Sequence, residues 1–274
     1  MPIEQNISHL KALMKKLAKK VALVTGGSEG IGFSCALSLA SEGCNLVLIS
    51  RNKKKLETAI SKIKNKYKIK CLAIEGDVAN PNLPLEALNI IRKQFNRLDI
   101  LINNTGGPPM GSFFHQNDRS WDMAINQNLL SVIRFTHNAF SLMKRNKFGR
   151  VINILSVLAK EPTPQMVLSS TTRAAVVAFS KSISYDLGPH GITINNIFPG
   201  GVLTKRFESL LIDRAKQLNK TTKDFLKERT NTVPVGKFAK PNEIASIILF
   251  LCDKNSSIIT GTSIIADGGQ SKSI

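Results

Sequence analysis

The chain has 274 residues, 42% of them hydrophobic, which suits one large α/β domain with a substantial core. No apolar run approaches the roughly 20 residues of a membrane-spanning helix, and the first residues lack the apolar region and cleavage site of a signal peptide. The net charge is +19, but the basic residues lie in helix-like stretches without interleaved aromatic residues, which favours a solvated lysine-rich surface over a nucleic-acid-binding one.

Cysteine usage points to a reducing compartment. Cys35, Cys44, Cys71 and Cys252 are scattered, without the spacing of metal ligands or of disulfide pairs. We therefore expect free thiols, no metal site and a cytoplasmic location.

The first 16 residues precede the domain. Ile3, Ile7, Leu10 and Met14 recur at helical spacing with lysines among them, which predicts a short basic amphipathic helix. We expect it to pack on the body or on a neighbouring subunit, because membrane attachment usually needs a second signal. Residues 17–274 form the predicted single domain.

From residue 20 onward the pattern alternates between short apolar runs and amphipathic stretches. The predicted strands are 20–25, 45–50, 69–75, 98–103, 149–155, 192–198 and 263–266. The predicted helices are 30–42, 52–66, 84–95, 118–145, 167–187 and 241–252. Continuous apolar strands separated by helices are typical of a doubly wound, seven-stranded parallel sheet with helices on both faces.

Residues 21–32, VALVTGGSEGIG, contain the most informative loop. Gly26, Gly30 and Gly32 would allow a sharp turn, close approach of the backbone to a phosphate, and packing of helix on strand. A glycine-rich turn alone is a weak signal. Here a strand precedes it and a helix follows, which favours a site that holds a pyrophosphate on the helix N-terminus, as in a Rossmann fold.

The spacing T-G-x-x-x-G-x-G resembles the short-chain dehydrogenase/reductase family. Further landmarks of that family follow along the chain: Asp77-Val78, Asn103-Asn104-Thr105-Gly106, Asn128, Ser156, Pro199-Gly200 and Asp267-Gly268-Gly269. The resemblance implies an oxidoreductase that interconverts a carbonyl and an alcohol with a nicotinamide cofactor. The glycine loop, the Pro-Gly segment and the ending GTSIIADGG are most similar to 3-oxoacyl-(acyl-carrier-protein) reductases, which implies a small-molecule or acyl-thioester substrate.

The end of the second strand predicts which cofactor is used. No acidic residue follows this strand to bind the ribose hydroxyls of NAD. Arg51 stands there instead, and its guanidinium suits a 2′-phosphate, so NADP(H) is the preferred cofactor and NAD(H) the second option. Two observations oppose this interpretation: Arg51 could simply begin a solvated helix, and Glu29 stands where NADP-binding relatives often carry a basic residue.

The resemblance implies a full set of cofactor-binding positions: Gly26, Ser28, Gly30, Ile31, Gly32, Arg51, Asn52, Asp77, Val78, Asn104, Gly106, Arg173, Pro199, Gly200 and Thr204. Among these, Asp77 would accept a hydrogen bond from the adenine amine, and Asn104 would adjoin the adenine ribose. Pro199-Gly200 with Thr204 would lie near the nicotinamide carboxamide. Outside this context, Asp after a strand and Pro-Gly are ordinary turn signals.

The family's catalytic row is Asn, Ser, Tyr and Lys, and the corresponding positions here hold Asn128, Ser156, Ser169 and Arg173. Tyr and Lys are thus replaced. The only two tyrosines of the chain, Tyr67 and Tyr185, lie elsewhere in the sequence, and the flanking segments match without a gap.

This replacement weakens the expected acid catalysis. An aliphatic hydroxyl, with a pKa near ~15, is a far poorer acid than a phenol near ~10, and a guanidinium does not give up its proton. Arg173 could still bind the ribose and stabilise a developing alkoxide, while Ser156, Ser169, Thr171 or Thr172 relays a proton from water. Alternatively, residues 169–172 merely begin a helix, with Ser or Thr as its N-cap.

Three functions therefore remain open. The first is a reductase with an atypical catalytic row, and the second is a dinucleotide-binding protein with little or no turnover, such as a sensor or an assembly subunit. Nucleic-acid binding, the third, rests on charge alone and would require strongly salt-dependent association.

Two further expectations come from the family. Residues 203–232 interrupt the alternation of strand and helix, and the resemblance implies that they form a substrate lid. The family also packs the helices predicted at 118–145 and 167–187 against symmetry mates. Ala174, Ala175 and Ala178 would permit close approach there, which predicts a homotetramer built as a dimer of dimers.

Overall fold

A computed structural model describes residues 15–273 of the protein. The predicted amphipathic helix of the N-terminal extension lies almost entirely outside the described residues. Where the description begins, the backbone N–H of Lys16 donates to the Glu42 carboxylate (3.0 Å) and its ammonium lies 3.3 Å from the Asp253 carboxylate.

Seven strands form one sheet: β1 (Val21–Thr25), β2 (Asn45–Ser50), β3 (Cys71–Glu75), β4 (Ile100–Asn104), β5 (Gly149–Ile154), β6 (Ile192–Pro199) and β7 (Thr262–Ala266). Their order is β3-β2-β1-β4-β5-β6-β7, and every neighbouring pair is parallel. The predicted doubly wound, seven-stranded parallel sheet is confirmed. The largest boundary errors are two residues, at the starts of β3 and β4.

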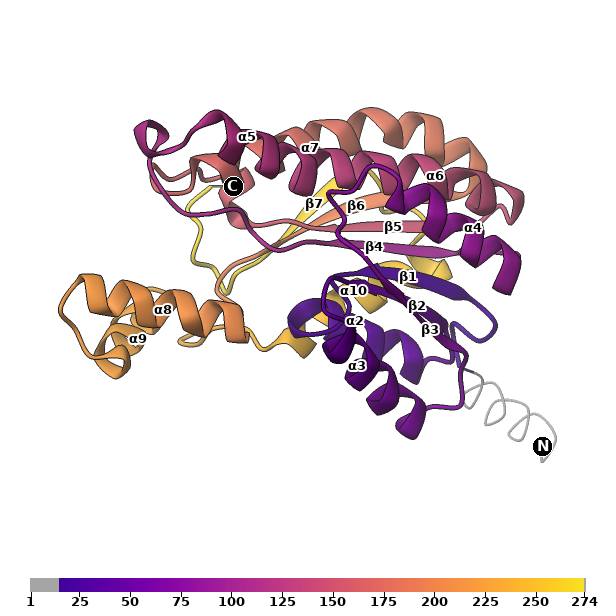
Figure 1. The fold of residues 1–274 in the computed structure, drawn as a ribbon, viewed down its shortest axis with the longest axis horizontal. Helices are drawn as coiled ribbons and strands as arrows, with labels where there is room; N and C mark the ends of the chain where they lie inside the picture. The colour runs from indigo at the N-terminus through magenta and orange to yellow at the C-terminus, as the bar shows by residue number, and fades with distance from the viewer. Residues whose placement is uncertain (1–14, 274) are drawn as a thin grey trace, which may run out of the picture.

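The helices are α2 (Gly30–Ser41), α3 (Lys53–Lys66), α4 (Leu83–Phe95), α5 (Asp118–Ala124), α6 (Ser131–Arg145), α7 (Val167–Leu187), α8 (Lys205–Gln217), α9 (Thr222–Asn231) and α10 (Pro241–Cys252). Helices α4 to α7 cover one face of the sheet, whereas α2, α3 and α10 cover the other (Figure 1). Helices α8 and α9 project from the body as a pair (Figure 1).

Alternation along each strand divides the core between the two faces. In β1, Ala22 and Val24 face the core shared with α2, α3 and α10, while Val21 and Leu23 face the core shared with α4 and α6. All four side chains are buried. Strands buried on both faces explain the continuous apolar runs in the sequence.

One predicted helix needs correction. Residues 118–145 are not a single regular helix, because a π-helical turn at Ile125–Leu130 separates α5 from α6. Side chains satisfy the carbonyls there: Asn126 Nδ2 donates to Asp122 O (2.9 Å), and Ser131 Oγ donates to Gln127 O (2.5 Å). Asn128 lies inside this widened turn.

Helices α8 and α9 lie within residues 203–232, the segment that interrupts the alternation of strand and helix. Leu211 and Ala215 of α8 pack on Phe225 of α9 and form a small core of their own. Thr204 and Thr221 cap the two helices, because each hydroxyl accepts a hydrogen bond from a backbone N–H in the first turn. The pair is thus a local unit attached to the body after β6.

The four cysteines are free and buried. Burial raises the pKa of the Cys71 thiol to about 11 and that of Cys252 to about 12, so both thiols are protonated and unreactive at neutral pH. Among residues 15–273, no helix is long and apolar enough to cross a membrane.

Candidate functional site

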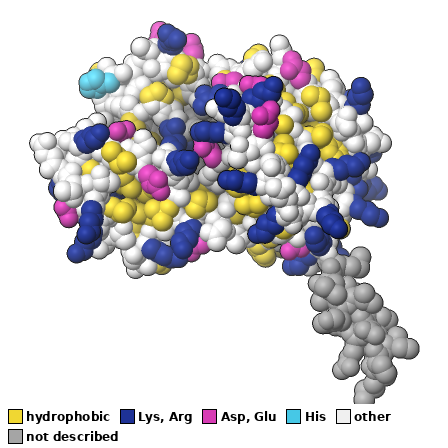
Figure 2. Space-filling view, turned by 60° about the horizontal axis from the view of Figure 1, so that its bottom comes forward, with side chains coloured by type: hydrophobic (Ala, Val, Ile, Leu, Met, Phe, Trp, Pro, Cys, Tyr) yellow, Lys and Arg dark blue, Asp and Glu magenta, His cyan; other side chains and the backbone are white. Residues whose placement is uncertain are grey.

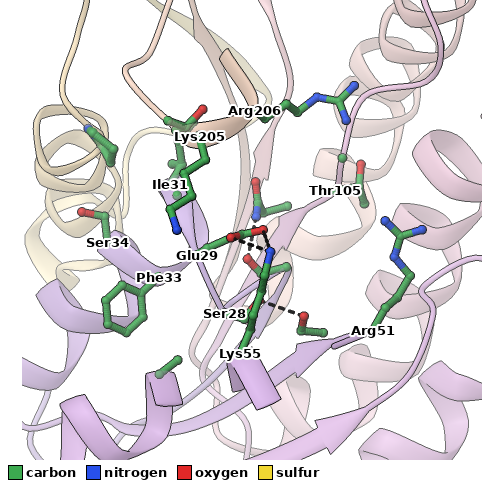
Figure 3. A pocket seen from close by; sticks show the side chains of 18 of the residues that line it. Ser28, Glu29, Ile31, Phe33, Ser34, Arg51, Lys55, Thr105, Lys205 and Arg206 are labelled. Carbon is green, nitrogen blue, oxygen red and sulfur yellow. Dashed lines mark hydrogen bonds and ion pairs between the residues drawn. The ribbon is translucent and has the colours of Figure 1, made fainter. Parts of the chain in front are cut away.

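A cleft of about 1080 Å³ lies at the carboxyl ends of the strands. It is lined by the loop after β1, the ends of β2 to β4 and the start of α8 (Figure 3). Strands β1 and β4 are neighbours in the sheet, but the chain departs from them in opposite directions. Such a switch point is where open α/β sheets bind ligands.

Three glycines of this loop could not easily be replaced by residues with side chains. Gly26 has φ +57°, and a Cβ there would lie 2.5 Å from Asn104 Nδ2. Gly30 has φ +59°, and a Cβ on Gly32 would collide with the carbonyl oxygen of Gly26. Helix α2 begins at Gly30, and Glu29 supplies no side-chain cap, so the first N–H groups of the helix are free for a ligand. This backbone cradle fits a pyrophosphate.

Asn104 holds the loop to the sheet. Its Nδ2 donates to the carbonyls of Thr25 (3.3 Å) and Gly26 (3.1 Å), and its backbone N–H donates to Thr25 Oγ1 (2.9 Å). The side-chain amide of Asn104, at the end of β4, therefore holds the glycine loop in place.

The end of β2 forms the charged wall of the cleft. Arg51 Nη1 lies 3.7 Å from Asp77 Oδ2, and both side chains are largely exposed. Asp77 Oδ1 accepts from the backbone N–H of Ala79 (3.0 Å), so this carboxylate also shapes the turn after β3. Asn52 caps α3 by accepting from Lys55 N (2.9 Å), which is a structural role.

Lys55 is a residue of this wall that sequence reasoning missed. Its ammonium lies 3.0 Å from both oxygens of Glu29 (Figure 3). The ion pair neutralises the carboxylate that argued against NADP. No sequence signal distinguishes Lys55 from the two lysines before it, because only the rotation of α3 decides which one faces Glu29.

The structure gathers ten of the predicted cofactor positions around the cleft: Gly26, Ser28, Gly30, Ile31, Arg51, Asp77, Val78, Asn104, Gly106 and Thr204. Five others do not line it: Gly32, Asn52, Arg173, Pro199 and Gly200. Gly32 is packed beneath Gly26, and Gly200 fits against Asp267 beyond the ends of β6 and β7.

The predicted catalytic residues come from elements that pack together, since α7 contacts both the π-helical turn and the 3-10 helix Val157–Ala159 after β5. Asn128 is 2% exposed, and its Oδ1 accepts from Thr105 Oγ1 (2.9 Å). Its Nδ2 is buried and has no hydrogen-bond partner among the residues that the structure describes. Leaving a buried donor without an acceptor is destabilising. A bound molecule or water that accepts a hydrogen bond from this Nδ2 would remove that cost.

Ser156 caps the 3-10 helix after β5. Its Oγ accepts from the backbone N–H of Leu158 (3.2 Å). Because a hydroxyl has one hydrogen and two acceptor sites, this bond orients the oxygen and leaves the hydrogen free to donate.

Ser169 and Arg173 lie in the first turns of α7. They are 1% and 8% exposed, and Arg173 Nη1 donates to Ser169 Oγ. The alternative of a Ser or Thr N-cap is wrong, because α7 begins at Val167 and is preceded by Met166. Tyr185 is exposed near the far end of α7, and Tyr67 ends α3 on the opposite face of the sheet.

Two further polar side chains were not foreseen. Arg206 Nη2 donates to Gly107 O (2.8 Å), and Gln127 Nε2 donates to Gly106 O (3.3 Å). Burial, and then the charge of Arg206, lower the pKa of Arg173 to about 10, so it remains charged at neutral pH. Burial and the charge of Arg51 also lower the pKa of Arg206.

Comparison with known proteins agrees with this architecture. The model of the short chain dehydrogenase family matches residues 20–215. The NADPH-dependent reductase BacG of Bacillus subtilis is 35% identical, over 94% of this chain and 100% of the relative. The 3-oxoacyl-[acyl-carrier-protein] reductase FabG of Aquifex aeolicus is 31% identical, over 93% and 98%. The structure of L-sorbose reductase from Gluconobacter frateurii, complexed with NADPH and L-sorbose, superposes with a TM-score of 0.91 at 27% identity, covering 96% of this chain and 100% of that one. The protein therefore belongs to the short-chain dehydrogenase family.

Proposed function

We propose that the protein is an NADP(H)-preferring reductase that interconverts a carbonyl and an alcohol. The observation that carries this proposal is the charge at the end of β2. Arg51 stands beside the glycine cradle, no carboxylate follows the strand, and Lys55 neutralises Glu29. An NADPH-dependent reductase and NADPH-bound structures among the relatives support the same cofactor.

The cofactor would be held along the cleft. The backbone of Gly26 and Gly30 and the N-terminus of α2 would hold the pyrophosphate, while Arg51 and Lys55 would supply positive charge to the 2′-phosphate. Arg51 is exposed and only loosely paired with Asp77, so it can turn to an arriving phosphate at little cost.

The reduced nicotinamide, when bound, supplies a hydride to the carbonyl carbon. Ser156 then donates its free hydroxyl hydrogen to the carbonyl oxygen and orients the substrate. The buried positive charge of Arg173, which donates a hydrogen bond to Ser169, acts through space and stabilises negative charge developing on that oxygen. The proton that completes the alcohol comes from water through a serine hydroxyl, because Arg173 keeps its proton.

The substrate is an oxo compound, and similarity to 3-oxoacyl reductases favours a 3-oxoacyl skeleton. Helices α8 and α9, within residues 203–232, act as the lid over it. Their separate small core supports movement as one body, and Thr204 at the base of α8 lies against Gly30 of the cleft.

A second function has its own support. Ser169 is buried and already bound by Arg173, so the position of the usual phenol offers no acid to a substrate. A protein that binds the dinucleotide with little or no turnover, as a sensor or assembly subunit, would need no general acid at this position.

Cofactor titration followed by turnover separates these two functions. We expect NADPH to bind more tightly than NADH in a fluorescence titration, and slow NADPH oxidation with ketones or 3-oxoacyl thioesters. Equal affinities would remove the basis for the cofactor assignment. Tight NADPH binding without turnover on any compound of the panel would favour the second function.

The homotetramer remains a prediction with a structural rationale. Ala174 and Ala178 are exposed on α7, so a second copy of this helix could approach closely. Light scattering at micromolar concentration should give the mass of four chains, and a monomeric mass would contradict the prediction.

A further inference from the structure

Two guanidinium groups meet at the loop that follows β4. Arg206 extends from the first turn of α8 above Thr105 (Figure 3) and donates to the Gly107 carbonyl at 2.8 Å. Arg173 reaches the same residue from α7. A Cβ built on Gly107 would lie 3.1 Å from Arg206 Nη2 and 3.9 Å from Arg173 Nη2. Gly107 therefore marks a point that both cations approach.

Neither cation has an acidic partner within residues 15–273. The ion pairs there include neither Arg173 nor Arg206. The cleft contains three acidic side chains, of which Glu29 is bound by Lys55 and Asp77 lies beside Arg51. Glu208 is the third, but two residues separated by two positions on a helix do not face each other.

Positive charge dominates the surroundings as well. Six lysines and arginines line the cleft, against those three acids. Figure 2 shows several Lys and Arg side chains, with some Asp and Glu among them, in the middle of one face of the molecule. The pKa values of Arg173 and Arg206 are both lowered, by burial and then by a neighbouring arginine. A buried charge without a counter-charge is destabilising, so this arrangement is suited to an incoming anion.

We propose that Arg173 and Arg206 together bind the carboxylate of the substrate, which makes the substrate an oxo acid rather than a thioester. This inference rests on the proposed reductase function. The shared chemistry is that of an oxyanion, which a planar guanidinium fork binds with two parallel hydrogen bonds. The other source of an oxyanion is the cofactor pyrophosphate.

The position of the pair favours the substrate. In the proposed function, the glycine cradle and the N-terminus of α2 would hold the pyrophosphate, and Arg51 and Lys55 would hold the 2′-phosphate. Arg173 instead belongs to α7, which packs beside the 3-10 helix capped by Ser156. A carboxylate between Arg173 and Arg206 would therefore lie on the side of the cleft where the reaction occurs.

The test compares an acid with its neutral ester. Acetoacetate and methyl acetoacetate are reduced with NADPH, and their kcat/KM values are compared. The wild-type protein should prefer the acid by about 10- to 100-fold, the range for a charge-assisted hydrogen-bonded pair. Arg206→Gln should remove most of this preference while the Kd for NADPH, from fluorescence titration, stays within about twofold. Lys216→Gln, an exposed change on the same helix away from the cleft, should keep the preference.

Binding of the product acid provides a readout that needs no turnover. Calorimetry of the NADPH-loaded protein should detect 3-hydroxybutyrate but not its methyl ester, and Arg206→Gln should lose the acid. A protein that oxidises no NADPH but binds 3-hydroxybutyrate through Arg206 would contradict the reductase and keep the anion site. Equal kcat/KM values for the acid and the ester would overturn the proposal. So would a variant Arg206→Gln that loses affinity for NADPH but keeps the preference for the acid. That last result would assign Arg206 to the cofactor phosphates.

Discussion

The two halves of the site differ in exposure and in how closely they follow the family pattern. In the cofactor half, formed by the glycine loop and the ends of β2 and β3, charged side chains pair at the surface; Lys55 and Glu29 are each 51% exposed. In the predicted reaction half, formed by Asn128, Ser156, Ser169 and Arg173, three of the four residues are buried. The sequence predicts that Ser169 and Arg173 replace the Tyr and Lys of the family.

This difference indicates that binding and chemistry can be changed separately. Exposed ion pairs contribute about 0–1 kcal/mol to stability, so charges in the cofactor half can be exchanged without unfolding the protein. In the reaction half, buried Arg173 is bound to buried Ser169 and Asn128 is bound by Thr105, and removing one partner leaves the other unsatisfied. Variants there need a measurement of stability beside the measurement of activity.

The largest expected change in kcat comes from introducing the Tyr and Lys that the family carries in its catalytic row. The double change Ser169→Tyr with Arg173→Lys should raise kcat on the neutral methyl acetoacetate by about 10²–10⁴-fold, because it restores a general acid. The initial rate of NADPH oxidation measures this, with the melting temperature as a check on folding. A folded double variant with unchanged kcat would show that Tyr and Lys are not what limits turnover.

Loss of the Ser156 hydroxyl should change kcat by nearly as large a factor, in the opposite direction. Ser156→Ala removes the donor to the carbonyl oxygen, which should lower kcat by about 10²–10³-fold. Ser182→Ala is the matched control, because that exposed hydroxyl only bonds its own helix, at Ala178 O. Fast turnover of Ser156→Ala would mean that another group carries the chemistry.

In the cofactor half, Arg51→Asp should reverse the coenzyme preference. Loss of a charge-assisted hydrogen bond should weaken NADPH binding by about 10- to 100-fold, and the new carboxylate should favour the ribose hydroxyls of NADH. Fluorescence titration of both coenzymes checks this, with Lys93→Asp on α4 as a control for net charge. An unchanged NADPH affinity would exclude Arg51 from the phosphate site.

The reaction half should show little pH dependence in substrate binding. The Arg173 pKa, lowered to about 10, keeps the guanidinium charged from pH 6 to 9, and a carboxylic acid is ionised throughout that range. The KM for acetoacetate should therefore be flat over this range. A tenfold change in KM between pH 6 and 8 would contradict this, with methyl acetoacetate as the neutral control.

The sequence could predict the features that arise locally. The β1 run, the glycine turn and the start of α2 are contiguous, so alternation and the need for positive φ identify them. The parallel sheet with helices on both faces was predictable because apolar strands alternate with helices. Boundaries moved by up to two residues, as expected where helix ends fray and strand ends open.

Contacts between distant segments were not predictable in the same way. The Lys55–Glu29 pair depends on how α3 is rotated against the glycine loop, and Arg206 reaches Gly107 across 99 positions of the chain. The periodicity of apolar residues likewise does not reveal the π-helical turn around Asn128, where Thr105 from another segment binds the Asn128 side chain and Ser131 satisfies a local carbonyl. These tertiary contacts decide the charge of the site.

The most direct test of the central claim is transfer of a labelled hydride. NADPH deuterated at the nicotinamide C4 position that is transferred would be mixed with excess protein and acetoacetate or methyl acetoacetate, and the hydroxy product would be analysed by mass spectrometry. If the protein is a reductase, the product should carry one deuterium on the carbinol carbon. The wild-type protein should form this product slowly, and the Ser169→Tyr, Arg173→Lys variant should form it far faster from the ester. NADPH that binds tightly but passes no deuterium to either compound, in either protein, would contradict it.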